Sequence, residues 1–489
     1  MSDQPTDQPS ELLAARRAKL DRIRAEGVEP FPHAFPGVIA IAEAQAPWQQ
    51  LEAGEERDDA YRIAGRLAAR RGQGKMAFLD IVDRSGRMQV QARADLLGEE
   101  AMAQLVEFDL GDLVGIDGTI FSSRSGELTL RVTGFTLLAK SLRPPPDKHH
   151  GLQDVETRYR RRELDLIANE EARELFVTRA KIVSELRRSL DDDGFIEVET
   201  PVLQPLYGGA LARPFVTHHN TLDRDLYLRI ATELYLKRCI VGGLERVYEL
   251  GKDFRNEGLS TKHNPEFTMV EWYEAYADYG NAMHRVEQLV VGIAEAINYD
   301  GPIDFSAPWP RIPMAQAIKD ATGIDITEAT EREALVAAIT ASDKVKLDVE
   351  DRPWPTLVDD LLSKYVEPAI TNPVFIIDYP TALSPFAKQH RSEPGLVERF
   401  EAFCGGMEFA NAFSELNDPD EQRRRFEDQV RLAEGGDEES QPYDEVFVQA
   451  LEQGMPPTAG VGLGIDRLVM LMTGRDSIRE VVLFPAMRD

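Results

Sequence analysis

The chain contains the stretch RVYELGKDFRNEGLSTKHNPEFTMVEWY at residues 246–273, which predicts two strands joined by a charged loop. The loop, Phe254–Phe267, has Gly258 and Pro265 as turn residues. A hairpin tip in solvent can have this composition. On the returning strand, however, a two-residue period places on one face Phe267, Met269, Glu271 and Tyr273. Carboxylates, a phenol and an aromatic ring make a poor core, so this face predicts a substrate-binding surface.

The residue types of this stretch favour a nucleotide site beside a cation site. Arg255 has the planar fork that suits a phosphate, and Phe267 can stack on a base. Glu271 and Tyr273 can hold a cation. We therefore predict an ATP site next to a site for a cationic group.

Length and composition indicate a large cytoplasmic protein of at least two domains. The chain has 489 residues, 43% of them hydrophobic, and only two cysteines, Cys239 and Cys404. Neither cysteine has a partner at metal-ligand spacing, so we expect neither a disulfide framework nor a structural zinc site. The N-terminal residues lack the apolar core of a signal peptide. No apolar run approaches the ~20 residues that span a bilayer.

The first third of the chain predicts a small β-barrel. A polar tail of about ten residues precedes a helix over 11–26, and a two-residue hydrophobic period begins at Tyr61. Five strands, with a helix after the third, indicate an OB-type barrel. We divide the chain into a tail and helix (1–57), the barrel (58–142), a linker (143–154) and a second domain (155–489).

One face of the barrel predicts a surface for unpaired bases. Phe78 lies opposite the apolar set of its strand, and Gln89 and Glu127 also lie off their apolar faces. A stacking ring flanked by an amide and a carboxylate suits base recognition, although an isolated surface phenylalanine remains an alternative. Nearby Arg70, Arg71 and Lys75 would contact phosphates.

The second domain carries the remaining polar constellations. We expect a helix over 170–192, a strand over 194–203, a helix over 232–243 that begins near Glu233, and a scaffold over 280–370. On the strand within 406–422, alternation places on one face Phe409, Asn411, Phe413 and Glu415. Glu408 would then lie on the opposite face, so a metal shared with Glu415 would require a bulge. Glycines 460, 462 and 464 lead to a helix that carries Arg467, near whose N-terminus an anion is favoured.

Three stretches together resemble the class II aminoacyl-tRNA synthetases. GFIEVETPVL (194–203) looks like motif 1, RVYELGKDFRNEGLSTKHNPEFT (246–268) like motif 2, and GVGLGIDRL (460–468) like motif 3. YGGALARPFVTHHN, ELYLKR, EFANAFSELNDP and SIREVVLFP are most similar to the lysyl enzymes of that family. The resemblance covers nearly the whole chain. Thr232 stands where the family usually has proline, which leaves the carboxylate of Glu233 in place.

The resemblance implies an α+β fold, in which a five-stranded OB barrel precedes an antiparallel catalytic sheet flanked by helices. It implies ATP-dependent ligation of L-lysine to tRNA(Lys) through a lysyl-adenylate, with release of pyrophosphate and AMP, by a cytoplasmic homodimer. The implied catalytic residues are Arg255, Glu257 and Arg467; ATP would be bound by Arg255, His263, Phe267, Glu408 and Arg467. Lysine would be bound by Gly209, Glu233, Glu271, Tyr273, Asn411, Phe413 and Glu415. Mg²⁺ would be held by Glu408 and Glu415, and the anticodon by Arg71, Phe78, Gln89 and Glu127.

The net charge of −29 disfavours nonspecific binding of a polyanion such as tRNA. We therefore expect positive potential to be confined to the barrel, the linker and the segment RYRRREL (158–164). Arginines in these parts that are scattered, or buried in ion pairs, would contradict the tRNA-docking role.

Three other functions remain open from the sequence. A lysyl ligase that modifies a translation factor resembles the catalytic half but lacks the barrel. An aspartyl or asparaginyl enzyme shares the architecture but needs a basic side-chain pocket. A catalytically inactive RNA-binding or scaffold homologue is opposed by intact Arg255, Glu257 and Arg467.

Overall fold

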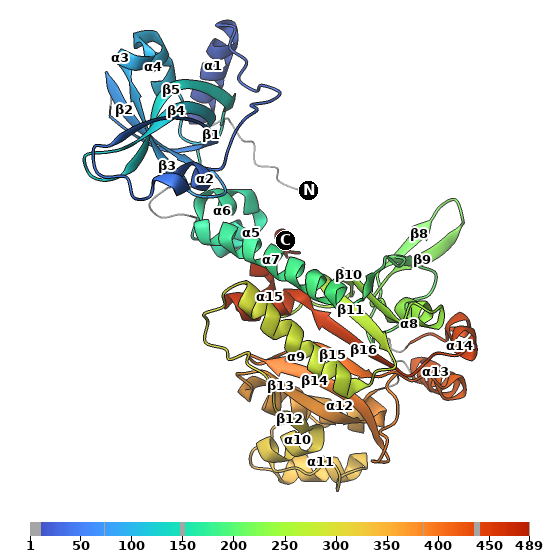
Figure 1. Cartoon of the computed structure of the whole chain (residues 1–489). Helices are drawn as coiled ribbons and strands as arrows, with labels where there is room; N and C mark the ends of the chain where they lie inside the picture. Colours follow the sequence, from blue (N-terminus) through green and yellow to red (C-terminus); the bar gives the residue numbers. More distant parts are fainter. Residues whose placement is uncertain (1–10, 73, 147–151, 385, 435–440, 489) are drawn as a thin grey trace. The chain divides into compact units, whose positions relative to one another are not determined.

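The computed structural model describes residues 11–72, 74–146, 152–384, 386–434 and 441–488 (Figure 1). The chain divides into two compact units, Met1–Arg173 and Glu174–Asp489. The polar tail expected over the first ten residues and much of the expected linker lie outside the described residues. Among the described helices, none is long and apolar enough to cross a membrane.

The first unit contains a closed five-stranded barrel, in which the strands follow the order β1-β2-β3-β5-β4. The predicted OB barrel is therefore confirmed, including the helical segment after the third strand. Its elements are α1 (Glu11–Ala25), α2 (Ile41–Gln45), η1 (Ala46–Trp48), β1 (Glu56–Arg71), β2 (Met76–Val82), β3 (Arg87–Arg93), α3 (Ala94–Leu97), α4 (Glu99–Val106), β4 (Leu113–Ser122), β5 (Leu128–Ala139), α5 (Val155–Arg160) and α6 (Arg162–Ala168).

Alternating side chains close the barrel interior. On β2, Ala77, Leu79 and Ile81 are almost completely buried, and the intervening Phe78 is half-buried on the other face. β2 pairs with β3 so that Phe78 lies opposite Gln91 and Asp80 opposite Gln89. The predicted period of two therefore holds, and it fixes which side chains face outward.

The second unit is built on an eight-stranded mixed sheet in the order β12-β13-β14-β15-β16-β11-β10-β6, with a separate three-stranded sheet β7-β9-β8. Its first elements are α7 (Glu170–Asp192), β6 (Ile196–Glu197), β7 (Leu203–Gln204), β8 (Val216–His219), β9 (Arg224–Leu228), α8 (Glu233–Val241), β10 (Arg246–Phe254), β11 (Glu266–Ala275), α9 (Tyr279–Ala296), β12 (Arg311–Pro313), α10 (Met314–Thr322), α11 (Arg332–Ala341) and α12 (Trp354–Leu361). The remaining ones are η2 (Leu362–Val366), η3 (Glu367–Ala369), β13 (Val374–Pro380), η4 (Thr381–Leu383), β14 (Leu396–Cys404), β15 (Met407–Ser414), α13 (Pro419–Glu434), α14 (Glu445–Glu452), β16 (Thr458–Gly464), α15 (Ile465–Thr473) and α16 (Ile478–Val481).

The expected continuous strand over 194–203 is wrong. The structure has only the two-residue strands β6 and β7 there. Between them, the backbone N–H of Thr200 donates to the side-chain carboxylate of Glu249 on β10 at 3.0 Å, and not to a backbone carbonyl. Pro201 follows, and it has no backbone N–H that could donate a hydrogen bond to a neighbouring strand.

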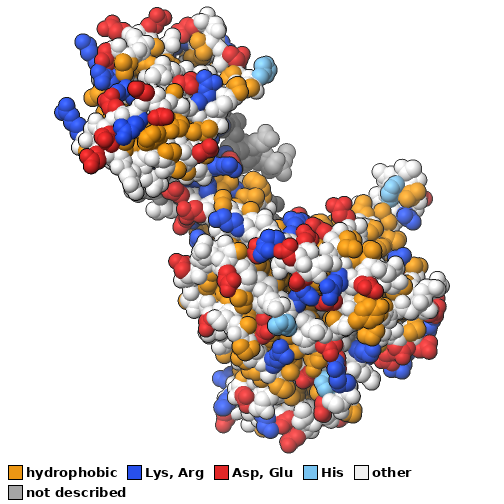
Figure 2. Space-filling model, viewed as in Figure 1, with side chains coloured by type: hydrophobic (Ala, Val, Ile, Leu, Met, Phe, Trp, Pro, Cys, Tyr) orange, Lys and Arg blue, Asp and Glu red, His pale blue; other side chains and the backbone are white. Residues whose placement is uncertain are grey.

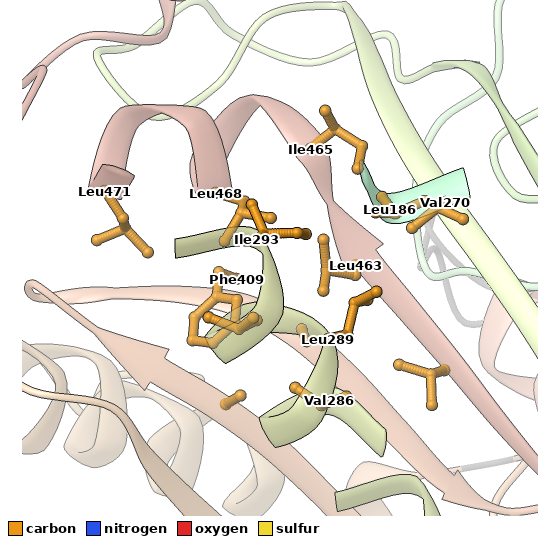
Figure 3. Close-up of a cluster of buried hydrophobic side chains, with 14 of the residues drawn as sticks. Leu186, Val270, Val286, Leu289, Ile293, Phe409, Leu463, Ile465, Leu468 and Leu471 are labelled. Carbon is orange, nitrogen blue, oxygen red and sulfur yellow. The ribbon is translucent and has the colours of Figure 1, made fainter. Parts of the chain in front are cut away.

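The main core lies between the sheet and helices α7, α9 and α15 (Figure 3). Val286, Leu289 and Ile293 of α9 pack there with Phe409 of β15 and Leu468 of α15. This apolar layer covers one face of the central strands and leaves the other face to polar side chains.

Candidate active site

A cavity of about 400 Å³ lies over the polar face of the central strands in the second unit. It is lined from β11, β15, β16, the start of α8 and the loop between β10 and β11. The structure brings together every site residue predicted in this half of the chain: Gly209, Glu233, Arg255, Glu257, His263, Phe267, Glu271, Tyr273, Glu408, Asn411, Phe413, Glu415 and Arg467. The predicted two-residue period on β11 is confirmed, since Phe267, Met269, Glu271 and Tyr273 all line this cavity.

At one end of the cavity, an arginine and an aromatic ring lie together. The guanidinium carbon of Arg255 lies 5.1 Å from the centre of the Phe267 ring. The two residues flank the loop between β10 and β11, whose hairpin pairing brings Phe254 opposite Glu266. Arg255 Nε is buried and has no hydrogen-bond partner among the described residues. A planar cation beside an aromatic plane can bind a phosphate next to a stacked base.

A second arginine contacts both a histidine and a carboxylate. Arg467 Nη1 donates to Glu408 Oε2 at 3.1 Å and to the Glu408 carbonyl oxygen at 2.7 Å, and its Nη2 lies 3.2 Å from His263 Nε2. Burial and the charge of Arg467 lower the pKa of His263. The histidine therefore favours its neutral form, in which it can accept a hydrogen bond from Arg467.

A bulge in β15 places Glu408 in the cavity. Ala402 of β14 pairs with Ala410, whereas the next residue, Phe403, pairs with Glu408. One residue of β15 is therefore extra, as in a β-bulge, and the face of the strand changes at this point. Phe409 lines the cavity with Asn411, as expected, but it is largely buried and also packs in the core (Figure 3).

Three carboxylates and a phenol line the other end of the cavity. The backbone N–H of Thr232 donates to Glu271 at 3.2 Å, and the Tyr273 hydroxyl lies 3.3 Å from the same carboxylate. Burial, together with the charges of Asp253 and Glu233, raises the pKa of Glu271 to about 8. Burial also raises the pKa values of Glu233 and Glu415. Such carboxylates are poorly solvated, and a cationic group that entered the cavity would stabilise their ionised forms.

Sequence reasoning missed Lys237, which is completely buried beside this end of the cavity. Its Nζ lies 2.6 Å from Glu233 Oε1 and contacts Glu415 Oε2. Burial opposes its charge, but Glu233 and Glu415 outweigh that effect and raise the pKa of Lys237. The spacing of four residues between Glu233 and Lys237 on a predicted helix was the signal that could have identified it.

Gln441 was also missed, and it lies immediately after an undescribed segment. Its Oε1 accepts a hydrogen bond from the Gly209 backbone N–H at 2.9 Å, and its Nε2 donates to the Ala210 carbonyl oxygen. Gln441 therefore fixes the turn that brings Gly209 to the cavity. No residue pattern near it in the sequence indicates this contact.

The glycines before Arg467 lie in strand β16 and not in a turn. A Cβ atom added to Gly460 would lie 2.0 Å from Glu415 Oε1 and 2.4 Å from the Tyr273 ring. The neighbouring side chains of the cavity therefore leave no room for a residue larger than glycine at position 460.

Mg²⁺ is usually bound by one or two carboxylates together with substrate phosphates. The described residues contain no group of three or more His, Cys, Asp or Glu side chains that could hold a metal ion. Glu408 and Glu415 both line the cavity, and Glu415 Oε1 accepts no hydrogen bond from any described residue. Both side chains supply the carboxylate oxygens that Mg²⁺ binds together with phosphate oxygens.

Some of the barrel residues that are predicted to recognise bases lie close to one another. Arg71 of β1 pairs with Phe78 of β2 across the ladder, and Arg71 Nη2 donates to Gln89 Oε1 at 2.9 Å. Gln89 Nε2 donates in turn to Thr129 Oγ1 at 3.0 Å. Glu127 is exposed in the turn before β5. Phe78 is thus framed by polar side chains, while the Gln89 amide is already engaged within the barrel.

The arginines of residues 158–162 take part in ion pairs, and of these only Arg162 is buried, so their docking role stays a prediction. Arg158 and Arg162 pair with Asp165, and the Arg162 side chain is buried. Arg160 pairs with Glu156 and Arg161 with Glu163. These local ion pairs neutralise the segment, and Figure 2 shows acidic and basic side chains intermixed on the visible surface. The remaining basic candidates are on the barrel, where Arg71 and Lys75 are exposed.

Comparison with known proteins gives two matches to family models. The model described as tRNA synthetases class II (D, K and N) matches residues 154–488, and the OB-fold nucleic acid binding domain matches residues 61–138. Similar curated proteins include the lysine–tRNA ligase of Dehalococcoides mccartyi, 50% identical over 491 residues and 98% of both chains. That of Chloroflexus aurantiacus is 51% identical over 490 residues, which cover 98% of this chain and 99% of its own.

Proposed function

The chain belongs to the class II tRNA synthetases of the D, K and N group, and from this premise we propose that it ligates L-lysine to tRNA(Lys) at the expense of ATP. The observation that carries the choice of lysine is the group of buried carboxylates, Glu233, Glu271 and Glu415, at one end of the cavity. An aspartyl or asparaginyl substrate would need a basic pocket there.

The first step is attack of the lysine carboxylate on the α-phosphorus of ATP, which forms lysyl-adenylate and releases pyrophosphate. The carboxylate is already a nucleophile, so the site needs no general base. Catalysis then consists of positioning and charge stabilisation. In the second step a ribose hydroxyl at the tRNA 3′ end attacks the lysyl carbonyl carbon, and AMP leaves.

The proposal assigns the nucleotide to the end of the cavity that carries the two arginines. Arg255 would bind the α-phosphate and the lysine carboxylate, with Glu257 beside it, and Phe267 would stack on adenine. Arg467 would bind the γ-phosphate, and His263 would lie near the phosphates. The contacts among Arg467, His263 and Glu408 support this assignment.

The proposal assigns the amino acid to the carboxylate end. Gly209 and Glu233 would bind the α-ammonium group. The ε-ammonium group would be bound by Glu271, Tyr273, Asn411, Phe413 and Glu415. Glu408 and Glu415 would hold Mg²⁺, which would supply positive charge to the phosphates when bound.

The domain division belongs to the same proposal, with the barrel (58–142) as the anticodon-binding domain and residues 155–489 as the catalytic domain. Arg71, Phe78, Gln89 and Glu127 would recognise anticodon bases. A ligase that modifies a translation factor would not need this barrel. We also propose that the protein is cytoplasmic and forms a homodimer.

An Arg255→Ala variant separates an enzyme from a catalytically inactive RNA-binding homologue. We expect the variant to lose lysylation of tRNA(Lys), by roughly 10²–10³-fold if one charge-stabilising donor is lost. It should retain tRNA binding in a filter assay. Wild-type protein that binds tRNA(Lys) but fails to attach lysine to it would contradict the proposal.

A further inference from the structure

Lys237 is a buried cation between two cavity carboxylates that lie on different elements. Glu233 is one turn before it on α8, and Glu415 follows the end of β15. Lys237 Nζ lies 2.6 Å from Glu233 Oε1, contacts Glu415 Oε2, and is 5.4 Å from the ring centres of both Phe386 and Phe413. The lysine thus joins the helix to the sheet through a charged bridge.

Stability alone is a weak explanation for this bridge. Removing charges from water is costly, and a buried ion pair is often no more stabilising than apolar residues of the same volume. Phe386, Phe413 and Leu236 already supply apolar packing in this region. A role in the neighbouring cavity accounts better for a fully buried charged side chain.

Lys237 acts on the cavity through other residues. Among the described residues, those that line the cavity include Glu233 and Glu415 but not Lys237. The other ionisable side chains here include Glu271 and Tyr273 on β11, and Arg399, whose Nε donates to Asn411 Oδ1 at 3.1 Å. The three carboxylates outnumber Lys237, and the ammonium groups of a substrate would favour their ionised forms.

We propose that Lys237 is a positioning residue that sets the separation between Glu233 and Glu415, and thereby selects an α-amino acid whose second ammonium group lies at the distance found in lysine. This inference rests on the proposed function, in which Glu233 meets the α-ammonium group and Glu415 the side-chain ammonium group. Ornithine is one methylene shorter, so we expect its two ammonium groups to reach the two carboxylates less well.

The test compares lysine and ornithine in ATP–pyrophosphate exchange catalysed by the full chain. For Lys237→Met, we expect the KM for lysine to rise at least about tenfold, while the KM for ATP changes less than about twofold. The preference for lysine over ornithine should fall towards parity, from the ~10–200-fold that one methylene is worth in a fitted site. Lys237→Arg retains the charge and should recover part of the preference.

The matched control is Lys364→Met, which removes a lysine whose Nζ lies 2.9 Å from Asp360 Oδ1, also four residues away, at an exposed site. It should leave both KM values and the preference unchanged. If thermal melting shows that Lys237→Met is unfolded, Lys237→Gln is measured in its place, because glutamine can still donate to one carboxylate.

The outcomes separate this inference from the proposed function. Unchanged lysine preference in a folded Lys237 variant would overturn the positioning role, as would equal increases in the KM values for lysine and ATP. Both results presuppose lysine-dependent exchange by the wild-type protein. Absence of that exchange would instead overturn the proposed function.

Discussion

Gly209 lies so close to Glu233 that a Cβ atom added to the glycine would be 2.9 Å from the Cβ atom of the glutamate. Gly209 also has a φ of +90°, a conformation that residues with a side chain rarely adopt. The Gly209 N–H donates to Gln441 Oε1 at 2.9 Å, and this hydrogen bond fixes the turn beside Glu233. The close approach to Glu233 and the positive φ explain why a glycine is needed at position 209.

Gly209→Ala should weaken lysine binding. The substitution strains the backbone by about 1–3 kcal/mol and pushes the turn away from Glu233. We expect the KM for lysine to rise roughly tenfold, in line with a loss of about 1.4 kcal/mol, with little change in the KM for ATP. Steady-state kinetics with each substrate varied would measure both values.

The control for this variant is Gly292→Ala on α9. A Cβ atom there would meet nothing within 4 Å, and the position needs no positive φ. Alanine in a helix is favoured over glycine by roughly 0.5–1 kcal/mol, so this variant should be slightly more stable and fully active. Equal loss of lysine affinity in both variants would contradict the role of Gly209.

Glu271 should make the ligand-free protein less stable as pH rises. Its pKa is raised to about 8 in the folded protein from 4.5, so the folded protein retains a proton that the unfolded chain releases. The contribution of Glu271 to the free energy of unfolding is largest below about pH 4.5. It decreases as the pH rises from there to about 8, and above pH 8 it no longer changes. Glu271→Gln removes this dependence.

Thermal unfolding of wild-type protein and of Glu271→Gln, measured from pH 6 to 9 without lysine, would check this. The Tm of the variant relative to wild type should increase between pH 6 and 8 and then level off. The expected change is a few degrees, because about 1 kcal/mol shifts Tm by ~2–4 °C in a domain of this order of size. A difference that does not depend on pH would show that Glu271 titrates normally.

Phe78→Ala should impair only the tRNA-dependent step of the reaction. Loss of one base–aromatic stack costs about 1–3 kcal/mol, which corresponds to roughly 5–150-fold in kcat/KM for tRNA(Lys). ATP–pyrophosphate exchange does not require the barrel and should be unchanged. Parallel loss of both activities would indicate misfolding, whereas no effect on tRNA would exclude Phe78 from the anticodon surface.

Arg161→Ala should have almost no effect on tRNA charging. Arg161 is exposed and pairs with Glu163 two residues away, so its charge is compensated locally. We expect a change of less than about twofold in kcat/KM for tRNA(Lys), because exposed ion pairs contribute only ~0–1 kcal/mol. A loss of tenfold or more would instead support the docking role expected for this segment.

The parts of the site that could be predicted from the sequence are those that depend on local periodicity. Alternation on β11 identified Phe267, Glu271 and Tyr273, and a helix start identified Glu233. Alternation on β15 is interrupted by a bulge, so that both Glu408 and the largely buried Phe409 line the cavity. Register shifts depend on contacts with neighbouring strands, and no pattern within β15 records them.

Contacts between distant segments were the other features that could not be predicted. Lys237 reaches Glu415, and Gln441 reaches Gly209, across separations that only the folded sheet brings together. The ion pairs of the basic segment at 158–162 could not be predicted for a related reason. The short helices α5 and α6 place carboxylates within reach of its arginines.

The most direct test of the central claim is amino-acid-dependent ATP–pyrophosphate exchange by the wild-type protein, measured for each of the twenty amino acids without tRNA. The carboxylate end of the cavity predicts exchange with lysine and with no other amino acid. Exchange with a different amino acid would contradict the assignment of Glu233, Glu271 and Glu415 to lysine, and exchange with none would contradict tRNA-independent adenylation at this site.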